Sequence, residues 1–179
     1  MAPTLRTAHT ADLTAAEHAA ARGLLDVAFD GDFSDEDWDH ARGGIHALVH
    51  DDTGLLAHGS VVMRRVLHRD RWLRVGYVEA VAVRTDARRH GLGGQVMDAL
   101  ERYVDGGYDF GALSASAAGS ALYTARGWQR WQGRISALGT AGVVRLPDEE
   151  GHVFVRPAAV ASLDPSDGLI FDWRDGDVM

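Results

Sequence analysis

Three consecutive strand-like segments in the middle of the chain are the feature that most constrains the fold. They are rich in Val, Leu and aromatic residues and are separated by short polar turns, and they cover residues 45–50, 55–67 and 72–83. Strands joined by turns this short pair with their sequence neighbours in opposite directions. The pattern therefore predicts an antiparallel meander.

An amphipathic helix follows the meander. Apolar residues recur at helical spacing over about 91–104, Gly106 and Gly107 mark the end of the helix, and residues 110–114 form an apolar strand. A strand–helix–strand crossover places its two strands parallel in one sheet. We therefore predict the α+β class, with a mixed, mostly antiparallel central sheet flanked by helices and one parallel pairing at its centre.

Helix and strand signals also occupy the two ends of the chain. Thr14 and Glu17 form a capping-box signature for a helix that runs to about Phe29, and Ser34 is placed to cap a short second helix. Residues 139–167 are loop-rich, with short strands at most. The other predicted elements are strands at 5–9, 128–138 and 153–156 and a helix at 119–126.

Length and composition exclude several classes of protein. The 179 residues, 46% of them apolar, suit a single domain covering 1–179. The chain has no Cys and no Lys, which excludes disulfides, thiolate metal sites, Schiff-base lysines and the phosphate-loop lysine. The net charge of −8 opposes nucleic-acid binding. With no signal peptide and no membrane-length apolar segment, we expect a cytoplasmic protein and no membrane partner.

The stretch over residues 81–94 carries the clearest chemical signal. It joins an apolar strand end to a polar turn, arginines and glycines, and then a helix. The first turn of a helix presents unpaired N–H groups, and glycine lets an anion approach them. Arg84, Arg88 and Arg89 add local positive charge. These features predict a phosphate site, the alternative being a glycine-rich turn with solvated arginines.

This stretch resembles the acyl-CoA motif of the GNAT N-acetyltransferase superfamily. Val81, Val83, Arg88, Gly91 and Gly93 match it, while Thr85 and Arg89 stand where proline and glycine are common. The glycines follow an arginine rather than a G-x-G turn, which argues against a Rossmann site.

The resemblance implies a V-shaped cleft that binds acetyl-CoA as cosubstrate. The pyrophosphate would lie on the loop, and the pantetheine would pair with the strand. The implied cofactor-binding residues are Val81, Ala82, Val83, Arg88, Arg89, His90, Gly91, Leu92 and Gly93.

Two residues are implied as catalytic. Tyr123, in the segment Leu122-Tyr123-Thr124-Ala125-Arg126-Gly127-Trp128, matches the tyrosine that protonates the departing thiolate in many superfamily members. The alternative is a tyrosine packed under the cofactor. Glu79 matches a glutamate that takes a proton from the attacking amine through ordered water, and the alternative is an ion pair with Arg74 or Arg64. A backbone N–H near Val81 would polarise the carbonyl.

Similarity along most of the chain is to the aminoglycoside 2′-N-acetyltransferases. The matching blocks begin at Asp30, Gly44, Gly76, Gly111, Pro147 and Asp172 and reach Val178. The resemblance implies acetyl transfer to the 2′-amine in a ternary complex, which inactivates the antibiotic, and a homodimer. The implied acceptor-binding residues are Asp32, Asp37, Glu79, Ala80, Ser114, Asp148, Glu149, Trp173, Asp177 and Met179.

The distribution of acids is consistent with a polycationic acceptor. Fourteen of the 26 acidic residues lie at 30–39, at 148–150 and after residue 163. We expect them to form a negative bowl, the alternative being a solvated acidic face. Glu149 and Met179 depart from the usual aspartate and tryptophan. His46 and His50 share a strand face without forming a chelate, so we predict no metal.

Two other functions fit the same residues. The chain could acetylate an endogenous amine or a cell-wall amino sugar, or it could be an acyl-CoA sensor without turnover. Glu79 and Tyr123 argue against the sensor, because both candidate proton-transfer groups are present.

Overall fold

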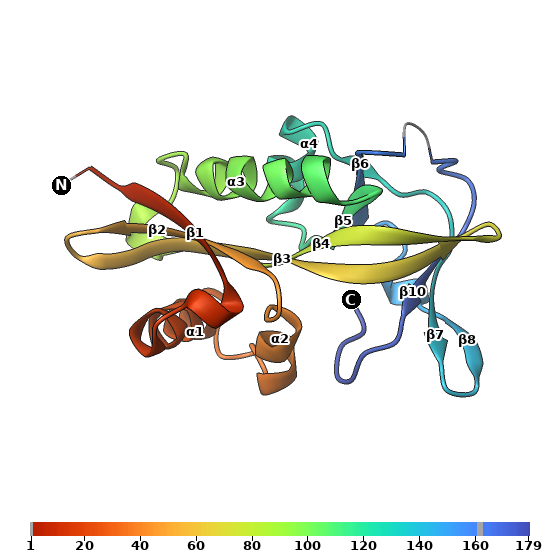
Figure 1. The fold of residues 1–179 in the computed structure, drawn as a ribbon, viewed down its shortest axis with the longest axis horizontal. Coiled ribbons are helices and arrows are strands. Elements are labelled where there is room, and N and C mark those ends of the chain that lie inside the picture. The colour runs from red at the N-terminus through yellow and green to blue at the C-terminus, as the bar shows by residue number, and fades with distance from the viewer. Residues whose placement is uncertain (1, 161–162) are drawn as a thin grey trace. The chain divides into compact units, whose positions relative to one another are not determined.

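The computed structural model describes residues 2–160 and 163–179. Its contacts define two compact units, each built from two stretches of chain. The first contains the chain up to Val62 and Val78–Arg102, and the second contains Met63–Tyr77 and Tyr103–Met179. Three elements contribute residues to both units: strands β3 (Gly54–His68) and β4 (Arg71–Val83) and helix α3 (Leu92–Gly107) (Figure 1).

The first unit begins with a strand and two capped helices. Its other elements are β1 (Thr4–His9), η1 (Thr10–Asp12), α1 (Ala15–Ala28), α2 (Asp35–His40), β2 (Ile45–Asp51) and η2 (Thr85–Ala87). The predicted capping box at α1 is present, with the Glu17 N–H donating to Thr14 Oγ1 and the Thr14 N–H to Glu17 Oε2. Ser34 caps α2 as predicted. Each box satisfies backbone donors that the helix itself leaves unpaired.

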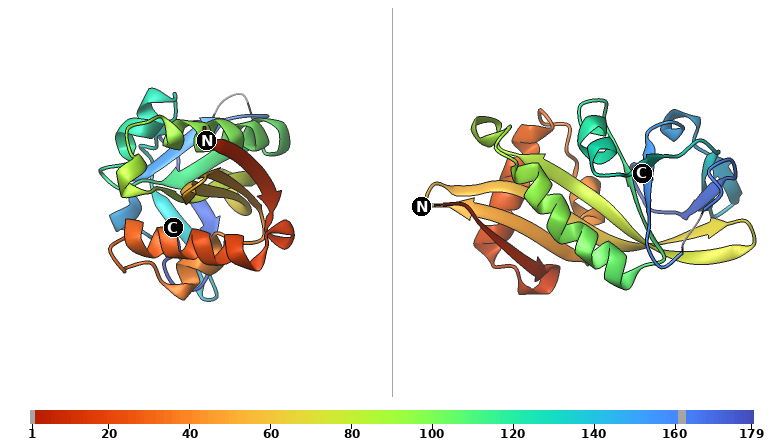
Figure 2. Two further views of the ribbon diagram at one scale, coloured as in Figure 1. Left: turned by 90° about the vertical axis from the view of Figure 1, so that its left-hand side faces the viewer. Right: turned by 90° about the horizontal axis from the view of Figure 1, so that it is seen from above.

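Helices cover both faces of the strands in the first unit (Figures 1 and 2). On one face, Leu24 and Leu25 of α1 pack in a cluster that includes Leu48 of β2. On the other face, Gly59 of β3 allows close approach of α3, because a Cβ there would lie 2.7 Å from Val96 Cγ1. The strands before residues 84–91 and the helix after them are thus held together by the core.

The second unit contains mostly short strands. Its other elements are β5 (Phe110–Ser114), α4 (Ser120–Ala125), β6 (Gln129–Arg130), β7 (Ile135–Gly139), β8 (Gly142–Arg145), η3 (Pro147–Glu149), β9 (Val153–Pro157) and β10 (Leu169–Asp172). The strand order is β6-β9-β5-β4-β3-β10-β7-β8, and β1 and β2 pair beside β3 in the first unit. Most pairings are antiparallel, which confirms the predicted mixed α+β sheet.

The sheet contains the parallel pairing predicted at its centre and one more that the sequence did not predict. Val75–Tyr77 of β4 pair in parallel with Phe110–Ala112 of β5, as the crossover predicted. A second parallel pairing joins β7 to β10. The strand predicted over 128–138 is also divided into β6 and β7, while β8 and β10 lie in or beyond the loop-rich region. Such short strands carry too little periodic pattern for detection, and long-range partners stabilise them.

Candidate active site

The loop over residues 84–91, where the sequence predicts a phosphate site and which is called the phosphate loop below, has two left-handed residues before α3 begins. The backbone φ angles are 64° at Arg89 and 78° at Gly91. Nothing lies within 4 Å of the position that a Cβ of Gly91 would occupy, so the backbone is open there. The Gln95 N–H donates to the Gly91 carbonyl, which leaves earlier amides of α3 directed toward the loop. The superfamily's preference for glycine at Arg89 follows from this conformation.

The three arginines of the loop differ in their availability. Arg84 donates to both carboxylate oxygens of Asp86, at 2.7 and 3.1 Å, and to Thr53. Arg88 is exposed and donates from its Nε to the Val83 carbonyl, and Arg89 is also exposed. The positive charge available to a phosphate therefore comes from Arg88 and Arg89. We expected Arg84 to contribute as well, but its charge is already neutralised by Asp86.

The other predicted residues of the loop have distinct environments. His90 is exposed, and its Nδ1 lies 3.3 Å from the Ala87 carbonyl, so the ring supports the turn. Leu92 is buried in the core, so only its backbone could reach a cofactor. Open glycine backbone, two exposed guanidinium groups and a helix start together fit an anionic diphosphate.

Ala80 interrupts the extended geometry of β4 between Glu79 and Val81. Its φ is 53°, a left-handed conformation that costs a non-glycine residue roughly 1–2 kcal/mol. Its carbonyl oxygen lies 2.9 Å from Nδ1 of His58. Residues 79–81 are half-buried in the first unit. The predicted base and the predicted carbonyl-polarising amide thus flank a kink in the strand.

Tyr123, the predicted acid, is buried in the second unit. It lies on α4, with ring centroids 6.2 Å from Trp128 and 6.1 Å from Phe154. Burial raises the pKa of Tyr123 to about 12. The phenol consequently stays protonated at neutral pH, as a proton donor must.

Many of the acidic residues counted in the sequence already have cationic or polar partners. In the first segment, Asp35 pairs with Arg22 at 2.8 Å, and the predicted acceptor residue Asp37 receives the Ser34 N–H at 2.8 Å. Asp32 is exposed. In the second unit, ion pairs to arginine use Glu150, Asp164, Asp167 and Asp172. The charge available to a polycation is smaller than the sequence count suggested.

Two predicted acceptor residues meet in the second unit. Ser114, at the end of β5, donates to Glu149 Oε2 of η3 at 2.8 Å. This bond orients a half-buried carboxylate that comes from a distant part of the sequence. Asp148, next to it, is exposed.

The C-terminal tail is held by a buried arginine. Arg64, 3% exposed, donates to the side chain and carbonyl of Asp172 and to the Val178 carbonyl, at 2.6–2.8 Å. Arg174 donates to a main-chain oxygen of Met179 at 2.7 Å, and the Met179 N–H donates to Asp177. Trp173 is 46% exposed. The tail that carries the predicted acceptor residues is therefore held by arginine side chains that donate to its main-chain carbonyl oxygens.

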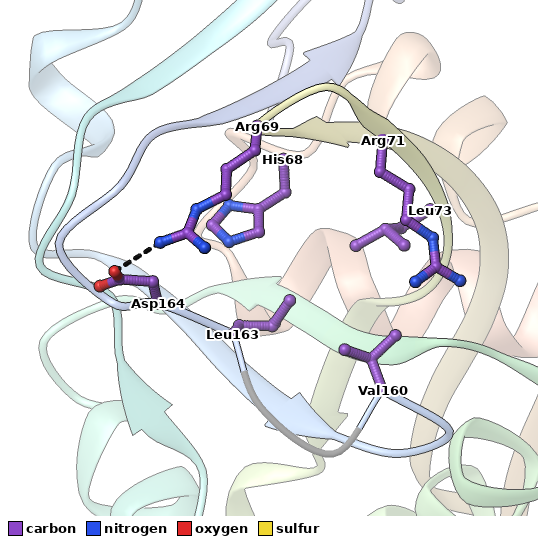
Figure 3. Close-up of a pocket in the computed structure, with 7 residues that line it drawn as sticks. All are labelled: His68, Arg69, Arg71, Leu73, Val160, Leu163 and Asp164. Atoms are coloured by element: carbon purple, nitrogen blue, oxygen red, sulfur yellow. Dashed lines mark hydrogen bonds and ion pairs between the residues drawn. The ribbon is translucent and has the colours of Figure 1, made fainter.

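A pocket in the second unit contains none of the predicted site residues (Figure 3). Its volume is about 340 Å³, and Arg69 reaches across it to Asp164. Its lining residues are His68, Arg69, Arg71, Leu73, Val160, Leu163 and Asp164. Two arginines at its wall make it unsuited to a polycationic ligand.

Two buried histidines adjoin the predicted site, and sequence analysis assigned neither of them to it. His46 Nδ1 lies 2.9 Å from His58 Nε2, and both side chains are fully buried. The partner of His46 is thus on β3 rather than at His50. The register between β2 and β3 places Leu48, two residues from His46, opposite His58. The histidine pair can be predicted only from this register, which joins distant parts of the sequence.

The family match agrees with this geometry. A family model described as an acetyltransferase (GNAT) domain matches residues 9–131, which include the kink, the phosphate loop and Tyr123. The chain belongs to the GNAT acetyltransferase family.

Known relatives of this GNAT acetyltransferase extend the match. A protein named aminoglycoside 2′-N-acetyltransferase from Mycolicibacterium fortuitum is 49% identical over 178 residues, covering 98% of this chain and 91% of that one. A GNAT acetyltransferase from Escherichia coli, YhbS, solved in complex with CoA, has a TM-score of 0.67 at 17% identity, covering 97% of this chain and 90% of that one. An acyl-CoA N-acyltransferase from Pseudomonas aeruginosa has a TM-score of 0.60 at 19% identity, covering 87% and 99%. The two structures support the fold.

Residues 2–160 and 163–179 contain no helix long and apolar enough to span a membrane. Within the same residues, no three His, Asp or Glu side chains are grouped so that they could hold a metal ion.

Acid should destabilise this GNAT acetyltransferase through its buried histidines. Burial lowers the pKa of His58 to about 4, and burial together with His58, His18, His9 and Arg42 lowers that of His46 to about 3. The unfolded chain therefore binds more protons than the folded chain as the pH falls from about 6.5 to 4. Stability should drop by up to ~1.4 kcal/mol per pH unit for each ring.

The measurement is urea unfolding of the wild type and His58→Gln at pH 7, 6 and 5. The variant lacks one buried ring, so its unfolding free energy should decrease less than that of the wild type as the pH is lowered from 7 to 5. If the unfolding free energies of the wild type and the variant changed equally with pH, His58 would take up its proton as readily in the folded chain as in the unfolded chain.

Proposed function

We propose that this protein transfers the acetyl group of acetyl-CoA to the 2′-amino group of aminoglycosides. The observation that carries the proposal is the 49% identity, over 98% of the chain, to a protein named for that activity. The exposed arginines and open backbone at the start of α3 support acetyl-CoA as the donor. The continuity of β3, β4 and α3 through both units supports one catalytic domain covering 1–179.

The chemistry needs a base, a polarising donor and an acid, and this chain offers a group for each. Glu79 accepts a proton from the ammonium of the acceptor, through water, because only a neutral amine can attack a carbonyl. The Val81 N–H donates to the carbonyl oxygen as negative charge develops on it. A C–N bond forms and the C–S bond breaks. Tyr123 gives its proton to the thiolate of CoA, and the second proton that the nitrogen loses on becoming an amide restores the phenol through water. The net products are the amide, the CoA thiol and the one proton that Glu79 took up.

Acceptor binding is assigned to the acids that family resemblance implies. Asp32 and Asp148 are exposed, while Asp37, Glu149 and Asp177 each use one oxygen in an intramolecular hydrogen bond and keep the other for a ligand. Charge-assisted hydrogen bonds to several ammonium groups would orient a polyamine sugar. The exposed face of Trp173 offers a surface for a sugar ring. The homodimer expected from family resemblance remains a prediction.

Acceptor specificity tests the proposed function. Release of CoA thiol is measured with tobramycin or gentamicin, which carry a 2′-amine, and with kanamycin A, which carries a 2′-hydroxyl. The chain has no cysteine, so a thiol reagent reports only the coenzyme. Release with the 2′-amine acceptors alone is expected. No release with any of them, despite acetyl-CoA binding, would contradict the function and favour the endogenous-amine or sensor alternatives.

Arg88→Ala should weaken acetyl-CoA selectively. Removing an exposed guanidinium from the phosphate loop should raise the KM for acetyl-CoA about tenfold and leave the KM for aminoglycoside unchanged. Arg84→Ala is the matched control, because Asp86 already neutralises Arg84 and its loss should change this KM less than about twofold. Equal increases in both KM values, or equal effects of the two variants, would contradict the phosphate role.

A further inference from the structure

A hydrogen-bonded chain of four links runs through the core of the first unit and ends at Ala80. The Gly43 N–H donates to Thr10 Oγ1 at 2.8 Å, and Thr10 Oγ1 lies 2.8 Å from His46 Nε2. His46 Nδ1 lies 2.9 Å from His58 Nε2, and His58 Nδ1 lies 2.9 Å from the Ala80 carbonyl oxygen.

When both rings are neutral, the Ala80 carbonyl fixes the direction of every hydrogen bond in the chain. A carbonyl oxygen can only accept, so His58 Nδ1 carries the hydrogen and, in the neutral ring, His58 Nε2 accepts. His46 Nδ1 must then donate, His46 Nε2 must accept, and the Thr10 hydroxyl must donate. At the far end, the Gly43 N–H can only donate. With neutral rings, each bond of the chain therefore has one hydrogen. The Thr10 hydroxyl lies nearer to His46 Nε2, at 2.8 Å, than to the Gly44 carbonyl, at 3.3 Å.

Burial keeps the chain in this state. Both imidazoles are fully buried, and the Trp38 ring lies 6.2 Å from each of them. A further proton on either ring would set N–H against N–H between His46 and His58 or remove the acceptor of the Thr10 hydroxyl. Trp38 lies on α2, so the same rings also contact the helix that carries Asp37.

We propose that His46 and His58 are positioning residues for acetyl transfer, because they hold the Ala80 carbonyl in place and so maintain the kink in β4. Glu79 and Val81 flank Ala80, so its backbone angles set the directions of the predicted base and of the predicted carbonyl-polarising N–H. A left-handed alanine is unfavourable in isolation and persists where its surroundings determine it. This inference rests on the proposed function.

Kinetics of His58 variants separate positioning from core packing. His58→Leu cannot donate to Ala80, whereas His58→Gln keeps an N–H of similar reach. His68→Leu is the matched control, because His68 is also buried and contacts a carbonyl, that of Gly168, at 3.1 Å. For each variant the Tm is determined, and kcat at saturating substrates and the Kd for acetyl-CoA are measured at a temperature below it.

His58→Leu should lower kcat about tenfold or more and change the acetyl-CoA Kd less than about threefold. His58→Gln should recover most of kcat, and His68→Leu should lower the Tm with kcat within about twofold of wild type. The proposal is overturned if His58→Leu keeps wild-type kcat, or if His68→Leu loses as much.

Imidazole nitrogen spectra of the wild type test the chain without activity and without a variant. Both rings should be neutral with the proton on Nδ1 between pH 5.5 and 8, and a proton on Nε2 of either ring would overturn the proposal. An inactive wild type would overturn the proposed function and the positioning role of the pair, while the spectra would still show whether the hydrogen-bond chain is present.

Discussion

The left-handed backbone of Ala80 is the constraint on which the site depends. An unbroken strand would continue the alternation of side chains and backbone groups through residues 79–83, and the kink changes the directions of the groups on either side of it. The buried rings of His46 and His58 compensate this unfavourable conformation by bonding the Ala80 carbonyl. Both rings are fully buried, and Trp38 of α2 packs beside them. Helices α1 and α2 lie on one face of the strands of the first unit and α3 on the other (Figure 1). The packing of the first unit, the hydrogen bonds of the buried rings and the proposed chemistry therefore all involve the backbone of Ala80.

Arginine determines which acids are available to a substrate. All 18 basic residues are arginine, and several of them pair with carboxylates in the segments that looked purely acidic in the sequence. Arg69 pairs with both Asp164 and Asp167, and Arg64 holds Asp172 together with the backbone of the tail. These pairs order loops that have little regular structure. A few exposed carboxylates then remain to attract a polycation, and their positions matter more than the net charge.

The sequence predicted those features whose signals are local. The capping boxes at Thr14 and Ser34, the meander, α3 and the turn at Arg88–Gly91 depend on nearby residues. The parallel pairing of β7 with β10, the histidine pair and the anchoring of the tail by Arg64 join residues far apart in the chain, and no local pattern encodes them. The roles of Glu79 and Tyr123 came from family resemblance. The geometry adds that one flanks a kink and that the other is a buried, protonated phenol.

A crystal structure with acetyl-CoA would test the role of the kink most directly. The thioester carbonyl oxygen should accept a hydrogen bond from the Val81 N–H at about 2.7–3.1 Å, with Ala80 still left-handed and its carbonyl still bonded to His58. A thioester bound elsewhere, or an extended Ala80 in the complex, would contradict the view that this kink forms the acetyl site.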